Sequence, residues 1–253
     1  MSLDALQFFF ILAGLVVATV VFIALFFVSA PYGRHARRGF GPMVPNHIGW
    51  FIMETPSVVM FAVLFATGTA PKSLPVLLFF ALWELHYVHR AFIYPWSIRD
   101  GHKKMPVVIL LLGFAFNIGN SYANGRYLFT QSGGYPQSWL LDFRFLAGVI
   151  FFVVGFMINR WADLKLRALR APGEMNYSIP YGGLFNKVSC PNYLGEIIEW
   201  CGWALATWSL PGLAFAVWTI ANLAPRARSH QTWYHSNFSD YPKQRKALIP
   251  WVW

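Results

Sequence analysis

Polar side chains that could bind a charged ligand gather between residues 159 and 199 of an otherwise apolar chain. Asn159, Asp163 and Arg167 stand at i, i+4 and i+8, so on a helix they share one face. Pro172-Gly173 then ends this helix, because proline lacks the amide hydrogen that a helix interior uses. The pattern predicts a polar helix face that stops at a turn.

A second polar face follows where the next apolar helix begins. Asn192, Glu196 and Glu199 stand at i, i+4 and i+7. The two glutamates continue into membrane depth, where a carboxylate is costly and marks a functional site by default. Two polar faces joined by a Gly/Pro loop with arginines form a plausible clamp for a large, polar, anionic ligand. The alternative is a solvated connector between two helices.

Glu54 is a carboxylate inside another apolar stretch, in the sequence METPS. At membrane depth it needs a partner or a proton, since desolvation disfavours its charged form. Thr55-Pro56 directly after it indicates a local kink, which often accompanies a site. The alternative is a glutamate near a helix end that reaches for water or caps a neighbour.

A third polar group lies in WELHYVHRAFIYPW, with Tyr87, Arg90 and Tyr94 at i, i+3 and i+7. Glu84 and His86 precede them. This mixture is dense for a surface that faces lipid, so we expect it to face a cavity. Tyr94 alone could instead belong to the aromatic belt at the membrane interface.

The C-terminal tail is aromatic, basic and rich in turn residues. Its His230 and Tyr234 stand at i and i+4 and could close a cytoplasmic cavity from the far side. The alternative is an interfacial anchor, with aromatic rings at headgroup level and lysines toward anionic lipid.

Several familiar motifs are absent. The sequence holds no GxGxxG after a strand and no GxxxxGK[ST], HExxH or GxSxG. A dinucleotide, if bound, is therefore not held by a Rossmann fold, and nucleotide hydrolysis, zinc proteolysis and a serine nucleophile have no support. Cys190 and Cys201 form no CxxC motif and no pattern with histidines, so we expect neither a disulfide framework nor a metal site.

The elements that must position these residues are transmembrane helices. The chain is 57% hydrophobic and only 12% charged, which is a membrane composition. The apolar runs of spanning length lie at about 5–29, 47–69, 74–95, 105–123 and 143–161. A further run, 193–223, is interrupted by Ser209-Leu210-Pro211-Gly212. Dividing it there predicts seven spans in one all-α membrane domain, 1–253; a kinked single helix would give six.

Basic residues alternate between the loops in a way that sets the orientation. The net charge of +10 does not indicate nucleic-acid binding, because the basic residues lie between apolar spans rather than in a soluble domain. With the N-terminus outside, 17 of the 20 Lys and Arg residues lie in cytoplasmic loops. Only Lys72, Arg126 and Arg144 lie on the outer side of the membrane. The C-terminus and the interval 159–199 are then cytoplasmic.

Long stretches of the chain closely resemble the steroid 5α-reductase family. They are LRALRAPGEMNYSIPYGGLF, PNYLGEIIEWCGWALATWSLPGLAFA, YPKQRKALIPWVW, HYVHRAFIYP and the glutamate in METPS. The resemblance extends from Tyr32 to the end. It implies a seven-helix membrane oxidoreductase in which NADPH reduces the C4–C5 double bond of a 3-oxo-Δ4-steroid.

The resemblance also implies roles for individual residues. Glu54 and Tyr87 match the pair that holds the substrate's 3-keto oxygen, and Trp50 and Met53 match substrate-pocket positions. The positions that match the cofactor site are Tyr32, Arg90, Tyr94, Asn159, Asp163, Arg170, Tyr177, Asn192, Glu196, His230 and Tyr234. Spans one to four would hold the substrate, and spans five to seven with the cytoplasmic loops would hold the cofactor.

Three positions depart from the family pattern. Met53 stands where the animal enzymes have a glutamine, and Ser178 stands where an arginine follows the matched tyrosine. The loop after Tyr94, with Arg99 and residues 102–104, does not follow the family's arginine pattern. The first departure puts steroid preference in doubt, and the other two put the grip on the cofactor phosphates in doubt.

The expected mechanism is hydride addition to C5 while negative charge develops on the ketone oxygen, with Tyr87 and Glu54 as hydrogen-bond donors. Arg170 and Arg90 are the candidate phosphate contacts, since guanidinium groups grip phosphate in pairs of hydrogen bonds. Asn192 and Glu196 suit the nicotinamide amide or the ribose hydroxyls.

The alternatives are an S-adenosylmethionine-dependent methyltransferase of the isoprenylcysteine type, a reductase of another lipid enone, and a lipid carrier or transporter. We expect a monomer among membrane lipids, in a bacterial inner membrane or an endoplasmic reticulum.

Overall fold

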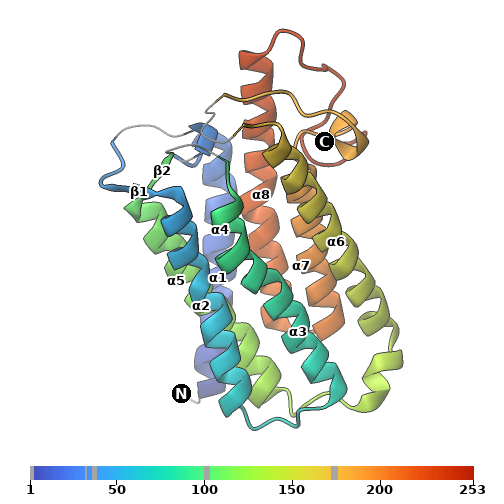
Figure 1. Ribbon diagram of the computed structural model, residues 1–253. Coiled ribbons are helices and arrows are strands. Elements are labelled where there is room, and N and C mark those ends of the chain that lie inside the picture. Colours follow the sequence, from blue (N-terminus) through green and yellow to red (C-terminus); the bar gives the residue numbers. More distant parts are fainter. Residues whose placement is uncertain (1–2, 32, 36–38, 100–102, 172–175) are drawn as a thin grey trace.

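The computed structural model describes residues 3–31, 33–35, 39–99, 103–171 and 176–253. They fold into a bundle of long helices (Figure 1). The helices are α1 (Leu3–Phe27), α2 (Asn46–Thr67), α3 (Leu74–Val88), α4 (Tyr94–Ser97), α5 (Val107–Arg126), α6 (Phe143–Ala168), α7 (Pro191–Thr207) and α8 (Leu210–Asn237). Two π-helices, His89–Ile93 and Tyr127–Gln131, continue α3 and α5. An antiparallel pair, β1 (Met43–Pro45) and β2 (Lys104–Pro106), joins the segments that lead into α2 and α5.

Five helical stretches of the described chain are long and apolar enough to cross a membrane. They are Asp4–Phe27, Asn46–Thr67, Leu74–Ser97, Val107–Gln131 and Phe143–Ala168. This is consistent with a multi-pass membrane protein. α7 has only 17 residues, and the second half of α8 is polar, so these two fall outside the set. Seven spans and their orientation stay a prediction.

The turn expected near Pro211 does separate two helices. Trp208 ends α7 in the left-handed conformation, with φ of 45°. The Ser209 side chain then accepts a hydrogen bond from the Gly212 amide and caps α8. The division of the run 193–223 into two helices is therefore confirmed.

Glycines bring α6 and α7 into close backbone contact. A Cβ atom on Gly155 would lie 2.3 Å from the amide nitrogen of Glu199, and one on Gly195 would lie 2.5 Å from that of Asn159. Gly148 and Gly202 meet the facing helix in the same way. Small residues that let two backbones approach are a common way to pair helices in membranes. We call this contact, formed by Gly148 and Gly155 of α6 with Gly195 and Gly202 of α7, the α6–α7 seam. It sets the distance between the two polar faces predicted from the sequence.

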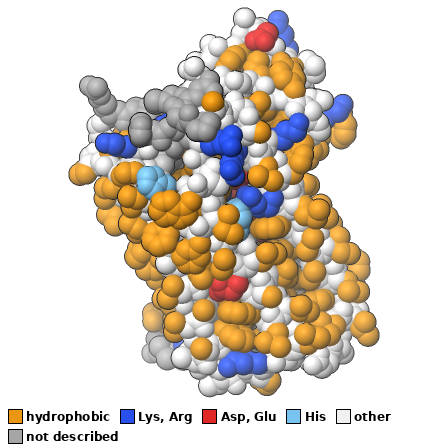
Figure 2. Space-filling view, viewed as in Figure 1, with side chains coloured by type: hydrophobic (Ala, Val, Ile, Leu, Met, Phe, Trp, Pro, Cys, Tyr) orange, Lys and Arg blue, Asp and Glu red, His pale blue; other side chains and the backbone are white. Residues whose placement is uncertain are grey.

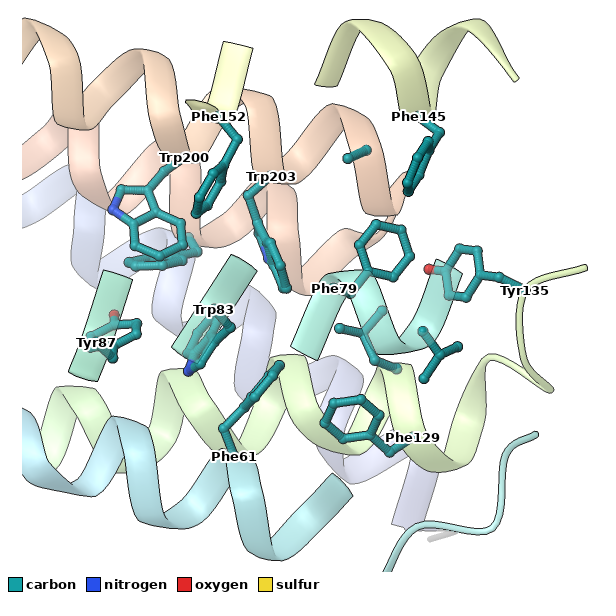
Figure 3. Packing of buried hydrophobic residues seen from close by; sticks show 14 residues of the cluster. Phe61, Phe79, Trp83, Tyr87, Phe129, Tyr135, Phe145, Phe152, Trp200 and Trp203 are labelled. Atoms are coloured by element: carbon teal, nitrogen blue, oxygen red, sulfur yellow. The ribbon is translucent and has the colours of Figure 1, made fainter. Parts of the chain in front are cut away.

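Large aromatic rings fill the middle of the bundle (Figure 3). Trp83 of α3 packs against Trp203 of α7 and Phe61 of α2, with ring centroids 5.2 and 4.3 Å apart. Trp200 of α7 lies 5.6 Å from Trp83. These rings fill the space between α3 and α7. Tyr87, one helical turn after Trp83, packs against Trp83 and Trp200.

Candidate active site

The bundle contains a polar cavity of about 240 Å³ where the ends of α2, α4, α6, α7 and α8 meet. The N-terminus lies at the other end of the bundle (Figure 1). Most of the cofactor residues implied by the resemblance line this cavity, together with Trp50. They are Arg90, Tyr94, Asn159, Asp163, Arg170, Tyr177, Asn192, Glu196, His230 and Tyr234. The structure therefore brings together residues from five separate segments of the chain. Tyr32 lies outside the described residues.

Basic side chains on the cavity wall were not all identified from the sequence. Besides Arg90 and Arg170, the wall includes Arg34, Arg99, Lys103, Arg160, Arg167 and Arg226. In Figure 2, Lys and Arg side chains gather on the upper half of the visible face, whereas hydrophobic side chains cover most of the rest. Of these, the sequence placed Arg167 on the polar face with Asn159 and Asp163, whereas Arg34, Arg160 and Arg226 were used only to set the membrane orientation. This wall is suited to an anion.

Arg90 connects the cavity to the buried glutamate. Its Nε lies 3.7 Å from Glu54 Oε1, and its Nη1 lies 4.0 Å from Asp163 Oδ2. The guanidinium also lies over the rings of Trp50 and Tyr94, at 4.5 and 4.6 Å. Two carboxylates thus compensate the charge of Arg90 before any ligand binds.

A π-helix places Arg90 on the cavity wall. The Tyr94 amide donates to the carbonyl of His89, five residues earlier. Pro95 lacks an amide hydrogen, and its ring would press on the Ala91 carbonyl in a regular α-helix, so the wider turn relieves both problems. π-Helical turns are frequent at functional sites. Helical periodicity alone did not predict this one.

Glu54 is buried, and a side chain of α5 donates a hydrogen bond to its carboxylate. Asn117 Nδ2 donates to Glu54 Oε2 at 3.1 Å and to the Met53 carbonyl at 2.7 Å. The Met53 side chain packs against Gly113, where an added Cβ would lie 2.2 Å from the sulfur. Neither Glu54 nor Met53 lines the cavity. Asn117 was missed in the sequence, although an asparagine within an apolar span is itself a signal.

Tyr87 lies in the aromatic core rather than on the cavity wall and is 3% exposed. Its ring packs against Trp83 and Trp200, with centroids 4.8 and 5.7 Å away (Figure 3). The polar side chains around its hydroxyl include Glu54, Ser57 and Asn120. Tyr87 and Glu54 therefore interact electrostatically in the buried region between α2, α3 and α5. That the two together hold a substrate ketone stays a prediction.

The adjacent histidine has a separate partner. His86 Nδ1 lies 2.7 Å from Glu199 Oε1, and both side chains are buried. Glu199 was grouped with Asn192 and Glu196 by its spacing. The structure places it deeper, away from the cavity wall.

The two polar faces of α6 and α7 meet directly. Asn159 Nδ2 donates to the Asn192 carbonyl at 3.0 Å and lies 3.4 Å from Glu196 Oε2. Asn192 Nδ2 donates to Asp163 Oδ1 at 3.3 Å. These contacts leave a carboxylate- and amide-rich wall beside Arg90.

Aromatic and basic side chains form the opposite wall. Arg34 lies over the rings of Tyr177 and Tyr234, and Arg170 lies 4.4 Å from the Tyr177 ring centroid. His230 pairs with His35 at 3.0 Å between ring nitrogens. The sequence prediction that His230 and Tyr234 close the cavity from the far side agrees with this placement.

Neither cysteine adds chemistry to the site. Cys190 is 3% exposed, and burial raises the pKa of its thiol to about 12. Among the described residues, no group of three or more His, Cys, Asp or Glu side chains could hold a metal ion.

Comparison with known proteins shows similarity along almost the whole chain. Residues 103–253 match the family model described as 3-oxo-5-alpha-steroid 4-dehydrogenase. The cattle protein named 3-oxo-5-alpha-steroid 4-dehydrogenase 1 (Bos taurus) is 43% identical over 237 residues, which is 92% of this chain and 91% of that protein. Steroid 5-alpha-reductase DET2 from Gossypium hirsutum is 41% identical over 245 residues, 94% of each chain. Mouse 3-oxo-5-alpha-steroid 4-dehydrogenase 2 (Mus musculus) is 45% identical over 228 residues, 88% of each chain.

Proposed function

The chain belongs to the 3-oxo-5-alpha-steroid 4-dehydrogenase (steroid 5α-reductase) family of oxidoreductases, and from this premise we propose that it uses NADPH to reduce the C4–C5 double bond of 3-oxo-Δ4-steroids to 5α-3-oxosteroids. The names of these relatives describe reactions on steroids. The similarity covers more than nine tenths of the chain, and so includes both the expected substrate spans and the expected cofactor spans.

The observation that carries the proposal is the position of Arg90. It lies on the wall of the polar cavity and also 3.7 Å from Glu54, which shares a buried spot with Tyr87. A cofactor in the cavity and a substrate ketone beside Tyr87 would then be neighbours. Such proximity is what direct hydride transfer between two bound molecules requires.

The cavity residues fit a phosphorylated dinucleotide. Bound NADPH would supply the hydride. Arg170 is suited to binding phosphate. The charge of Arg90 is already compensated by two carboxylates, so Arg90 is better suited to the region near the reacting atoms. Asn192 and Glu196, on the carboxylate-rich wall, suit the ribose hydroxyls or the nicotinamide amide, because a carboxylate would repel phosphate.

Tyr87 and Glu54 would polarise the ketone. As hydride reaches C5, negative charge develops on the ketone oxygen, and the Tyr87 hydroxyl is a donor in a site that packed rings shield from bulk solvent. Glu54, held by Asn117 and beside Arg90, would add a second donor or fix the first. A hydrogen bond of this kind is stronger in a dry site than in water.

The membrane arrangement is part of the proposal. One domain of seven spans, 1–253, would place its N-terminus outside and its cavity in the cytoplasm, so that NADPH arrives from water and the steroid arrives from the bilayer. Spans one to four would mainly contact the substrate. A bacterial inner membrane and an endoplasmic reticulum both fit this arrangement.

The test is NADPH oxidation by detergent-purified protein with and without a 3-oxo-Δ4-steroid, with the C5 configuration of the product determined. Steroid-dependent oxidation with a 5α product is the expected result. NADPH binding without oxidation would indicate another lipid enone as substrate. Binding of S-adenosylmethionine in place of NADPH would overturn the proposal in favour of methyl transfer.

A further inference from the structure

A row of buried polar side chains extends from Tyr87 away from the cavity. Its members lie on α1, α2 and α5, within a bundle that is otherwise apolar at this level. We call it the polar row; it consists of Ser57, Asn120, Ser121, Asn124 and Gln7.

Helical register places the three α5 members of the polar row, Asn120, Ser121 and Asn124, near the side of α5 that carries Asn117. Asn117, Ser121 and Asn124 stand at i, i+4 and i+7, and Asn120 lies between them. Seven residues of α-helix rise by about 10 Å, so this side of α5 extends from the level of Glu54 across roughly a third of the membrane.

Contacts connect parts of the row, at Tyr87, at Asn120–Asn124 and at Gln7. Asn120 is among the side chains around the Tyr87 hydroxyl. Asn124 Nδ2 donates to Asn120 Oδ1 at 3.0 Å. Gln7 of α1 donates to the Ala123 carbonyl at 3.0 Å, at the far end of the row.

Several buried atoms of the row have no hydrogen-bond partner among the described residues. They are Ser57 Oγ, Asn120 Nδ2, Ser121 Oγ and Gln7 Oε1. Of these side chains, Ser57 and Asn120 are also neighbours of the Tyr87 hydroxyl. Ser57 and Ser121 are 0% exposed, and Gln7 is 6% exposed. Unpaired polar atoms in an apolar interior are costly, and buried water is the usual partner of such groups. Unpartnered groups on three neighbouring helices between Tyr87 and Gln7 are what a file of water molecules would require.

The outer end of the row lies near solvent at the N-terminal end of the bundle. Asp4, one helical turn before Gln7, is exposed and lies 3.5 Å from Arg126. This end is opposite the polar cavity (Figure 1).

The proposed reaction consumes one proton. The substrate gains a hydride at C5 and a proton at C4, and only the hydride comes from the cofactor. If the Tyr87 hydroxyl proton passes to the ketone oxygen as C5 is reduced, the product is the enol and Tyr87 is left deprotonated. Conversion of the enol to the ketone exchanges the oxygen-bound proton for one on C4, so a single proton must return to Tyr87 from outside.

We propose that the polar row conducts this proton to Tyr87 from the N-terminal side of the membrane, opposite the cofactor cavity. Hydroxyl groups both donate and accept hydrogen bonds, so they can pass a proton along a line of water molecules. The inference rests on the proposed function. The charged and titratable groups around the row are Tyr87 and Glu54 at its inner end and Asp4 and Arg126 at its outer end; on α3 and α7, His86 and Glu199 pair with each other beside Tyr87.

Proteoliposomes test the proposal. External NADPH cannot cross the bilayer, so it supports only molecules whose cavity faces outward, and the pH of the lumen then acts on the N-terminal end alone. With the external pH fixed, raising the lumen pH from about 6 to about 9 should slow wild-type turnover. The variants Ser121→Ala and Gln7→Leu should turn over roughly tenfold or more slowly, since a proton-transfer role contributes at least this much. They should keep the wild-type affinity for NADPH.

A matched control is Ser132→Ala, which removes a hydroxyl from the end of the Tyr127–Gln131 helix, away from the row. It should keep the wild-type rate and lumen-pH dependence. Thermal unfolding of each variant separates loss of the row from loss of folding; Ala is a good helix former, so Ser121→Ala should stay folded. A Gln7→Leu variant with lowered stability is replaced by Gln7→Asn, which keeps an amide donor and acceptor in the row and should turn over faster than Gln7→Leu.

Wild-type turnover that ignores the lumen pH, together with row variants that keep the wild-type rate, would overturn the inference and leave the proposed function intact. Absence of steroid-dependent NADPH oxidation in the wild type would instead overturn the proposed function, and with it the need for a substrate proton.

Discussion

At the scale of single residues, Trp83 and Trp200 pack against the ring of Tyr87, and we expect its hydroxyl to donate to the substrate ketone. Tyr87→Phe keeps the ring and removes only the hydroxyl. We expect kcat to fall by on the order of 100- to 1000-fold, as for the loss of one oxyanion donor, with NADPH affinity unchanged. Steady-state kinetics and equilibrium binding measure the two quantities.

The control for this variant is Tyr135→Phe. Tyr135 is also buried, and its hydroxyl donates to the Thr207 carbonyl at 2.6 Å, away from the cavity. Losing that bond should lower the free energy of unfolding by about 1 kcal/mol without lowering kcat. Normal turnover by Tyr87→Phe would remove Tyr87 from the mechanism.

We expect Glu196 to contribute to cofactor binding rather than to the ketone site. It lies on the cavity wall, within 3.4 Å of Asn159 Nδ2. Glu196→Gln keeps the shape but weakens an acceptor of hydroxyl hydrogen bonds, so the Kd for NADPH should rise roughly tenfold, the equivalent of about 1.4 kcal/mol. Isothermal titration calorimetry measures it. Glu84→Gln, which lies off the cavity wall, should leave the Kd unchanged, and an equal effect of both changes would contradict the assignment.

At the scale of elements, the α6–α7 seam holds the two polar faces in register. In Gly155→Ala, the new Cβ would meet the backbone nitrogen of Glu199 at 2.3 Å, and a backbone atom cannot move aside cheaply. We expect a lower thermal midpoint and weaker NADPH binding, because the helices that carry Asn159 and Glu196 must separate. Gly14→Ala, with 3.6 Å to Trp218 Nε1, should change neither property. Similar midpoints for the two variants would show that the seam tolerates a methyl group.

Most of the helices and of the polar faces they carry could be predicted from the sequence. Apolar length predicted the helices, and the spacing of Asn159 and Asp163, and of Asn192 and Glu196, predicted two faces that the structure joins in one cavity. The π-helix at His89–Ile93 could not be predicted, because periodicity assumes a regular turn and the wider turn is a response to Pro95. Glu199 shows the same limit: spacing assigned it to a face but not to a depth.

Pairing between distant segments was also beyond the sequence. Asn117 lies more than sixty residues from Glu54, and nothing local connects them. Arg90, Arg167 and Arg170 were assigned to ligand binding from the sequence, but Arg34, Arg160 and Arg226 were read only as orientation signals, and the structure places them on the cavity wall as well.

At the scale of the whole molecule, orientation is the property that links the two ends of the bundle. Leu141→Cys, at the end of the short 3-10 helix Gln137–Leu141, and Lys243→Cys place reactive thiols at exposed positions near opposite ends of the bundle. In intact cells, a membrane-impermeant maleimide should label the first variant and not the second. The native Cys190 should stay unlabelled, because its buried thiol has a pKa near 12 and holds its proton. The reverse pattern would invert the proposed topology.

The aromatic core has an optical consequence. Trp83, Trp200 and Trp203 are shielded from solvent beside Tyr87, and Trp50 stands on the cavity wall under Arg90. Reduced nicotinamide absorbs light in the range where tryptophan emits, so its arrival in the cavity should dim the protein's own fluorescence and brighten that of the cofactor. With the proposed cofactor bound, the protein's tryptophans would report the redox state of that cofactor, readable in a bilayer without any added dye.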